Sequence, residues 1–219
     1  MARRTARGGL QPRGRKAKRV VGKSSRPHQR NNRFYIYDSR HNRSGKDAVA
    51  EFLKKKGFSR YSCSDIIREE CAKRGLETTR DNLIRVGNEL REKFGNGYLA
   101  GEILKKIKND KSENSVVVSI RHPGEVEILK SDPSFKMILI NAPLEIRYAR
   151  TQDRNQNRPE DKDSFEKFKE NEEKERTGTG SGQQLNLVAK MADDIIVNDG
   201  SFEDLHKKMV ETLTKYESR

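Results

Sequence analysis

Short β-prone runs alternate with segments of helical periodicity from residue 34 onward. The run Ser115–Ile120 (Ser-Val-Val-Val-Ser-Ile) is nearly unbroken in apolar character, as expected for a strand buried inside a parallel sheet. This alternation predicts an α/β fold, with a five-stranded parallel sheet covered by helices on both faces. The predicted strands are Phe34–Tyr37, Phe58–Ser64, Ser115–Ile120, Phe135–Asn141 and Asp194–Asn198.

The helices between these strands are predicted from apolar spacing and from the residues at their ends. Apolar residues recur at helical spacing after Asp47, and Gly57 ends that helix. Pro123 and Pro143 each open a helix, because proline fits the first helical turn. The other predicted helices are Asp65–Arg74, Arg80–Phe94, Tyr98–Lys108, Asp163–Arg176 and Phe202–Tyr216.

Charge divides the chain into two parts. The 219 residues contain 47 Lys and Arg against 33 Asp and Glu, a formal net charge of +14. Residues 1–33 contain 12 basic residues and no acidic one, so the remainder is nearly neutral. Glycine, proline and few large apolar residues make this segment unable to fold alone. We therefore expect a disordered basic arm, residues 1–33, before one folded domain, residues 34–219.

Three interpretations of the arm remain open. Clustered Lys and Arg bind RNA or DNA by displacing counterions from phosphates. An arginine-rich segment without acidic residues is also typical of an organelle transit peptide, although Gly and Pro interrupt any amphipathic helix. The third interpretation is a solubilising tail. We expect an uncleaved arm that binds nucleic acid.

Several protein classes are excluded by composition. No apolar run approaches the roughly 18 residues that a membrane span needs. The two Cys and four His lack the spacing of a disulfide framework or a structural zinc site, and we expect Cys63 and Cys71 to be small buried apolar residues. We therefore expect an intracellular, cytoplasmic protein without a membrane partner. A targeting role of the arm would instead direct it to the nucleus or a mitochondrion.

Ser44-Gly45-Lys46 stands between the first predicted strand and the first predicted helix. A Gly-Lys pair in this context is typical of a P-loop, whose backbone amides and helix N-terminus hold phosphates. Lys46 is expected to neutralise the β- and γ-phosphate oxygens of ATP. Asp47 stands where a hydroxyl normally binds magnesium, and its carboxylate can serve Mg²⁺ instead. The alternative is an ordinary helix N-terminus with a solvated lysine.

Further segments extend this pattern in order along the chain: Asn42–Asp47, Ser62–Glu70, Ile120–Glu127, Ala142–Arg150 and Asn198–Gly200. Together they resemble the P-loop nucleoside-monophosphate-kinase-like proteins, in particular deoxynucleoside monophosphate kinases and dephospho-CoA-kinase-related proteins with an adenylate-kinase-like fold. The resemblance implies a P-loop kinase fold with a helical lid at about residues 147–182, and ATP and Mg²⁺ as cofactors. It assigns the nucleotide contacts to Asn42, Arg43, Ser44, Gly45, Lys46 and Asp47, with Asp47 as the metal ligand.

Three residues outside the loop are expected to bind the phosphate acceptor. Asp65 and Arg68 are three positions apart, so they share a helix face, and the resemblance implies that they contact the acceptor nucleotide. Arg121 follows a strand at the edge of the sheet where ligands bind in open α/β folds, and we expect it to bind the acceptor phosphate. The alternatives are a surface ion pair for Asp65 and Arg68 and a surface arginine for Arg121.

Four arginines are spaced three, four and four positions apart, which predicts one arginine-lined helix face: Arg147, Arg150, Arg154 and Arg158. Like charges at this spacing repel, so such a face needs anionic company. The resemblance implies a lid that closes over the transferring phosphates, and we assign Arg150 and Arg154, with Lys46 and Arg121, to catalysis. A solvated charged helix is the alternative.

Two departures from the family pattern leave the function class open. Arg40 replaces the first glycine of the loop, and Val118-Ser119 stands where the family commonly has Asp-Gly. The first hypothesis is an ATP-dependent (deoxy)nucleoside monophosphate kinase that phosphorylates a nucleoside monophosphate or a similar acceptor. The alternative is a degenerate kinase fold that serves as an RNA-bound structural component of a ribonucleoprotein such as a ribosome. The retained Lys46, Arg68 and Arg121 favour the enzyme.

Overall fold

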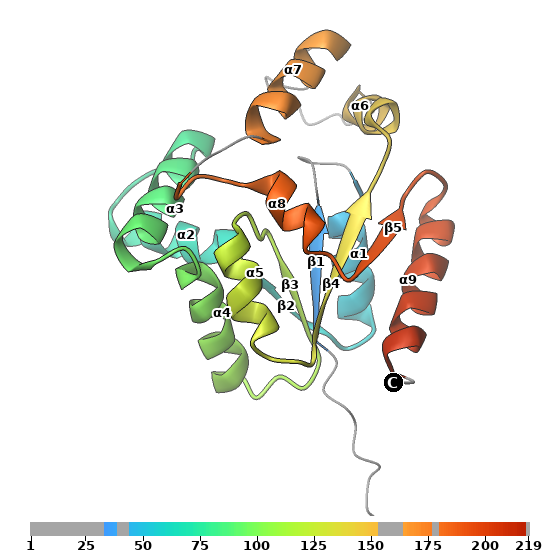
Figure 1. Cartoon of the computed structure of the whole chain (residues 1–219), viewed down its shortest axis with the longest axis horizontal. Helices are drawn as coiled ribbons and strands as arrows, with labels where there is room; N and C mark the ends of the chain where they lie inside the picture. Colours follow the sequence, from blue (N-terminus) through green and yellow to red (C-terminus); the bar gives the residue numbers. More distant parts are fainter. Residues whose placement is uncertain (1–32, 39–43, 153–163, 177–179, 218–219) are drawn as a thin grey trace, which may run out of the picture.

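The computed structural model describes residues 33–38, 44–152, 164–176 and 180–217. Its strands form one parallel sheet in the order β2-β3-β1-β4-β5 (Figure 1). The predicted α/β class is therefore confirmed. The predicted arm lies outside the described residues, except for Arg33, which is the first residue of β1. The strands are β1 (Arg33–Asp38), β2 (Ser59–Ser62), β3 (Ser115–Val118), β4 (Phe135–Asn141) and β5 (Asp194–Val197).

The helices follow the predicted order, with α8 in addition. The predicted strand Ser115–Ile120 already ends at Val118, because Ser119 has a left-handed φ of +64°. The predicted strand Phe58–Ser64 is shorter than expected, because α2 already begins at Cys63. The helix α8 was not predicted; it has only 6 residues, and the burial of Leu185 and Val188 fixes it. The helices are α1 (Lys46–Lys55), α2 (Cys63–Lys73), α3 (Arg80–Phe94), α4 (Tyr98–Asn109), α5 (Pro123–Lys130), α6 (Leu144–Gln152), α7 (Phe165–Arg176), α8 (Leu185–Lys190) and α9 (Phe202–Glu217).

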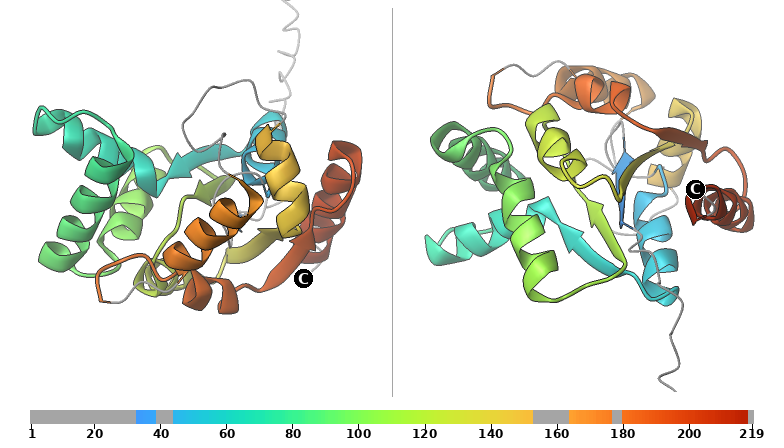
Figure 2. Two further views of the ribbon diagram at one scale, coloured as in Figure 1. Left: turned by 90° about the horizontal axis from the view of Figure 1, so that it is seen from above. Right: turned by 60° about the horizontal axis from the view of Figure 1, so that its bottom comes forward.

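Two hydrophobic cores lie on opposite faces of the sheet. Alternate residues of β4 point to opposite faces, so Ile138 and Ile140 join the core under α1 and α9. Met137 and Leu139 join the other core, which α2, α3, α4, α5 and α8 cover. Figure 2 shows α1 and α9 on one side of the sheet and α4, α5 and α8 on the other.

The strand order creates a crevice at the carboxyl ends of β1 and β3. From β1 the chain passes through α1 to β2, whereas from β3 it passes through α5, on the opposite face, to β4. Neighbouring strands whose connections leave in opposite directions open a crevice where ligands bind in open α/β sheets. This edge faces α6 and α7 at the top of Figure 1. Within the described ranges, no helix is long and apolar enough to cross a membrane.

Candidate phosphate-binding site

Gly45 ends the loop after β1 and is the N-cap of α1. Its φ of +103° lies in the left-handed region, and a Cβ at this position would lie 2.3 Å from Asn198 Nδ2. Only glycine fits both the backbone and the space. No described side chain caps the first amides of α1. These amides, together with the helix dipole, suit an anion such as phosphate.

The residues beside Gly45 have contrasting environments. Ser44 is only 1% exposed, and its Oγ has no hydrogen-bond partner among the described residues. The Lys46 side chain is 11% exposed, and its Nζ lies 3.2 Å from Oδ2 of Asp47, whose side chain is 72% exposed. The predicted cofactor residues Ser44, Gly45, Lys46 and Asp47 therefore lie together at the start of α1. The others, Asn42 and Arg43, lie outside the described residues.

Arg150 reaches this loop from α6 through Asn198. Its guanidinium donates from Nη2 to Asn198 Oδ1 at 3.3 Å and to the Gly200 carbonyl at 3.4 Å. Asn198 in turn donates from Nδ2 to the Ser44 carbonyl at 2.7 Å. Burial lowers the pKa of Arg150, so its charge is incompletely solvated and an anion in the crevice would stabilise it.

The predicted arginine face of the lid is only partly present. Arg147 is fully buried, and its Nε donates to the Ala142 carbonyl at 3.0 Å. Its guanidinium lies 6.0 Å from the centre of the Phe168 ring. The expectation that Arg147 lines an open lid face is therefore wrong, because its buried guanidinium fixes the start of α6. Arg154 and Arg158 lie outside the described residues, beyond the end of α6 at Gln152.

On the acceptor side, serine side chains join the carboxyl ends of β2 and β3. Ser62 Oγ lies 3.1 Å from Ser119 Oγ. Ser119 has a left-handed φ of +64°, the conformation that a glycine adopts most easily. The neighbouring Val118 is buried in the core under α1 and α9. It therefore offers no ligand group at the position where the related kinases commonly have Asp.

Arg121 is fixed through its main chain. Its N–H donates to Glu125 Oε2 at 2.7 Å, and its carbonyl accepts from the Gln184 N–H at 2.9 Å. Its Nη1 lies 3.5 Å from Gln183 Oε1. The segment before α8 therefore lies against the residue predicted to bind the acceptor phosphate.

The buried carboxylate of Glu125, whose role the sequence did not predict, holds the main chain of Arg121 and His122. Glu125 is fully buried and accepts from Arg91 Nε at 2.9 Å, from the Arg121 N–H and from the His122 N–H at 3.2 Å. His122 Nδ1 accepts from the Gly124 N–H at 3.1 Å, so the ring proton lies on Nε2 and is donated to the Gly180 carbonyl at 3.0 Å. A glutamate two residues after a proline is an N-terminal helix signal, but its partner Arg91 lies 34 positions away.

Asp65 and Arg68 form an ion pair at the start of α2, which was the alternative to the predicted contact with an acceptor. Arg68 Nη1 lies 2.9 Å from Asp65 Oδ1, and both side chains are 50% exposed. Such a pair adds at most about 1 kcal/mol to stability, so a ligand can replace either contact at little cost. The nearby Cys63 is buried, as predicted; burial, with the Glu125 carboxylate, raises the pKa of its thiol well above the usual value. Cys63 is therefore an apolar packing residue and not a nucleophile.

The residues of the loop fit magnesium in one respect. Asp47 supplies an exposed carboxylate, the oxygen ligand that Mg²⁺ prefers. The described residues contain no cluster of three or more His, Cys, Asp or Glu that would form a metal cage. Mg²⁺ in kinases is held by one or two carboxylates together with substrate phosphates, so a single Asp beside a phosphate loop suits it.

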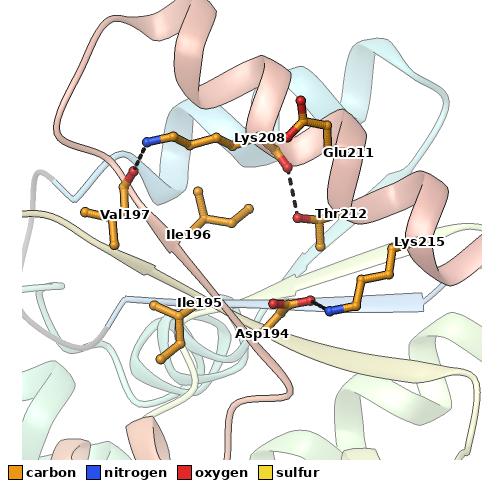
Figure 3. A pocket seen from close by; sticks show the side chains of 8 residues that line it. All are labelled: Asp194, Ile195, Ile196, Val197, Lys208, Glu211, Thr212 and Lys215. Atoms are coloured by element: carbon orange, nitrogen blue, oxygen red, sulfur yellow. Dashed lines mark hydrogen bonds and ion pairs between the residues drawn. The ribbon is translucent and has the colours of Figure 1, made fainter.

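A separate hollow lies between β5 and α9 (Figure 3). It runs along the whole of β5, and none of its lining residues comes from the loop, α2 or α6. One of its lining residues, Lys208, also contacts the candidate site. Its Nζ donates to the Val197 carbonyl at 2.7 Å and to Asp199 Oδ1 at 3.0 Å. Lys208 therefore holds the residues on both sides of Asn198.

Comparisons with known proteins identify the family and the fold. Residues 42–178 match the family model described as "AAA domain". The chain is 38% identical over 176 residues to a UPF0200/UPF0201 protein of Archaeoglobus fulgidus, covering 78% of this chain but only 52% of that relative. It is 35% identical over 177 residues to a UPF0200 protein of Thermococcus gammatolerans, covering 78% of this chain and 89% of the relative.

The solved structures show the same fold at low sequence identity. Shikimate kinase from Acinetobacter baumannii, in complex with shikimate, aligns with a TM-score of 0.50 and 17% identity, covering 85% of this chain and 95% of that protein. The resemblance to P-loop kinases is therefore confirmed at the level of the fold. The chain belongs to the UPF0200 family and carries an AAA domain with the α/β fold of P-loop kinases.

Proposed function

We propose that the protein is an ATP-dependent phosphotransferase of the nucleoside-monophosphate-kinase type. The observation that carries this proposal is the start of α1, where a left-handed Gly45 presents uncapped helix amides next to Lys46. The crevice between β1 and β3 supports it, because Lys46 lies on one side and Arg121 on the other. Cationic side chains on both sides of one crevice, Lys46 with Arg150 and, opposite them, Arg121, suit two phosphorylated ligands.

In the proposed reaction, an oxygen of the acceptor attacks the γ-phosphorus of ATP. This is an anionic phosphate oxygen in a nucleoside monophosphate, or a ribose hydroxyl that loses its proton to solvent in dephospho-CoA. The bond from that phosphorus to the β,γ-bridging oxygen breaks, and ADP leaves with the electron pair. The protein positions both ligands and neutralises their charge, without a covalent intermediate. Lys46 and Arg150 serve the donor phosphates, whereas Arg121, Arg68 and Asp65 serve the acceptor. Bound Mg²⁺ neutralises phosphate charge, and Asp47 is the residue that would hold it.

The nucleotide site is tested by calorimetry with Mg-ATP on the wild type and on Lys46→Ala. We expect at least a 10-fold loss of affinity, which is about 1.4 kcal/mol. Lys54→Ala is the matched control, because Lys54 is an exposed lysine in the last turn of the same helix. Equal ATP affinity in all three proteins would overturn the nucleotide site.

The acceptor is tested by measuring ADP release with nucleoside monophosphates, deoxynucleoside monophosphates and dephospho-CoA. We expect one of these classes to stimulate release. Lys46→Ala should abolish the stimulation, because phosphoryl transfer requires the neutralised donor phosphates. ATP binding without stimulation by any acceptor would favour the second candidate function.

That second candidate is an RNA-bound structural component of a ribonucleoprotein, and the observation that favours it is the basic segment at residues 1–33. Its 12 uncompensated basic residues should bind RNA or DNA without sequence preference, with log K falling linearly as log salt rises. Removing residues 1–32 should abolish this binding in either case. An enzyme should keep phosphoryl transfer after the deletion, whereas a structural component should show no turnover at full length and should co-sediment with a large RNA particle only when the arm is present.

A further inference from the structure

Asn198, which follows β5 directly, joins the phosphate loop to α6. Its side chain is almost completely buried, at 3% exposure. Nδ2 donates to the Ser44 carbonyl at 2.7 Å, while Oδ1 accepts from Arg150 Nη2 at 3.3 Å. A carboxamide carries a donor and an acceptor side by side without a charge, so one side chain makes both contacts at once.

The sheet and α9 hold Asn198 in place independently of the loop. Its N–H donates to the Asn141 carbonyl at 2.7 Å, which continues the pairing of β4 with β5. Lys208 fixes the residues before and after it, Val197 and Asp199. The carboxamide therefore has a fixed position to which both the loop and Arg150 adjust.

The contact with Ser44 sets the direction of an amide in the loop. In a trans peptide the carbonyl and the following N–H point in opposite directions. Fixing the Ser44 carbonyl on Asn198 therefore turns the Gly45 N–H to the other side of the peptide. A side chain at Gly45 would collide with Asn198 Nδ2. The hydrogen bond from Asn198 to Ser44 therefore requires a glycine at position 45.

We infer that Asn198 is a positioning residue that couples the phosphate loop to the lid arginine Arg150. Through Ser44 it orients a loop amide toward the ATP phosphates, and through Arg150 it holds a guanidinium next to the same phosphates. The hydrogen bonds of Arg150 to Asn198 and to the Gly200 carbonyl, at 3.3 and 3.4 Å, are long enough to be exchanged for hydrogen bonds to a charged phosphate oxygen. This inference rests on the proposed nucleotide site but needs no acceptor and no turnover.

The test is calorimetry with Mg-ATP and with Mg-ADP on a set of variants of the full chain. Asn198→Ala should lower the affinity for both nucleotides at least 10-fold, because both contain the phosphates that the loop binds. Arg150→Ala should lower ATP affinity more than ADP affinity, because the arginine serves the terminal phosphate. In the Asn198→Ala background, Arg150→Ala should have a clearly smaller effect on the ATP/ADP ratio, since the guanidinium has already lost its position.

Asn198→Asp separates the two contacts. The carboxylate still accepts from Arg150 but no longer donates to Ser44. Asn198→Asp should therefore lose nucleotide affinity, whereas the effect of Arg150→Ala on the ATP/ADP ratio should remain in full. The control is Asn82→Ala, because Asn82 Nδ2 donates to the Glu77 carbonyl at 2.9 Å on α3, far from the loop. It should leave affinity for both nucleotides unchanged.

Thermal melts of all variants establish that the proteins are folded, and Asn198→Asp carries the test if Asn198→Ala does not fold. Unchanged nucleotide affinity in a folded Asn198 variant would overturn the inference alone. Additive effects of Asn198→Ala and Arg150→Ala on the ATP/ADP ratio would also overturn it. A wild type that binds no ATP would overturn the proposed function, and the inference with it.

Discussion

The proposed donor side, at the start of α1, and the proposed acceptor side, after β3, are held by different chemistry. On the donor side, an uncharged amide, Asn198, links the loop to Arg150 through neutral contacts. On the acceptor side, a fully buried ion pair of Arg91 and Glu125 fixes the main chain of Arg121. A guanidinium held by long neutral contacts exchanges easily onto a phosphate. A main chain held by a buried carboxylate does not move, because every partner lost would leave a buried charge unsatisfied.

The comparison indicates which side adapts to its ligand. The donor side includes α6, whose Arg150 is half-buried. The ring of Tyr148 on α6 contacts Phe165 and Phe168 of α7, and the Arg147 guanidinium also lies over the Phe168 ring. The acceptor side presents a fixed backbone with half-exposed side chains on α2. We therefore expect nucleotide binding to reposition Arg150, and acceptor binding to replace the Asp65–Arg68 pair without backbone movement.

The largest expected effect is on the acceptor side. Glu125→Ala should lower the free energy of unfolding by about 3–5 kcal/mol, because it leaves Arg91 buried without its partner. Urea unfolding measures this loss. Glu127→Ala is the matched control, since Glu127 is exposed on the same helix and should change stability by less than about 0.5 kcal/mol. A small effect of Glu125→Ala would contradict the conclusion that the buried ion pair makes the proposed acceptor side rigid.

A smaller loss of stability is expected on the donor side from Gly45→Ala. The left-handed φ costs about 1–3 kcal/mol for a residue with a Cβ, and the Cβ also displaces Asn198. Gly57→Ala has a similar φ of +90° with nothing within 4 Å of its Cβ, so it reports the backbone cost alone. Gly45→Ala should be the less stable variant and should lose ATP affinity. Equal melting temperatures would show that the Asn198 contact contributes nothing.

Ligand specificity should separate the two sides. Arg121→Ala and Arg68→Ala should each lower kcat/KM for the acceptor about 10-fold, through a higher KM or a lower kcat. This loss corresponds to about 1.4 kcal/mol of transition-state stabilisation. The affinity for ATP should stay unchanged. Steady-state kinetics with calorimetry measures both. Arg74→Ala is the control, because Arg74 is paired with Glu70 and Glu89 at the far end of α2. A loss of ATP binding in Arg121→Ala would move that residue to the donor side.

The smallest effect concerns acid stability beside Asn198. The hydrogen bond from Lys208 lowers the pKa of Asp199 below its ordinary value of 3.8. A lowered carboxyl pKa stabilises the fold above the ordinary value, and this stability is lost as the pH falls through the lowered pKa. Lys208→Met should therefore reduce the loss of stability below pH 3.8. Melting temperatures against pH measure it, with Lys54→Met as control; parallel curves for the two variants would contradict the assignment.

The sequence by itself predicted most of the fold and the donor loop. Apolar runs and helix-end residues gave the bounds of α3 and β4 correctly, because local periodicity and chain-breaking residues specify them. Ser44-Gly45-Lys46 was predicted to bind phosphate for the same reason, because a phosphate loop is a contiguous motif between a strand and a helix. The short helix α8 was not predicted, because 6 residues are too few to show a helical periodicity of apolar residues.

Tertiary structure alone decided what surrounds that loop. Asn198 lies 154 positions from the residue that it contacts, and no local pattern distinguishes it from an ordinary asparagine after a strand. Arg147 and Arg150 occupy equivalent positions in the sequence pattern, yet Arg147 is buried against Ala142, whereas Arg150 donates to Asn198. The buried pair of Arg91 and Glu125 joins α3 to α5. Such contacts depend on how helices pack across the sheet, and helical or strand periodicity specifies which face a residue lies on but not which distant residue it meets.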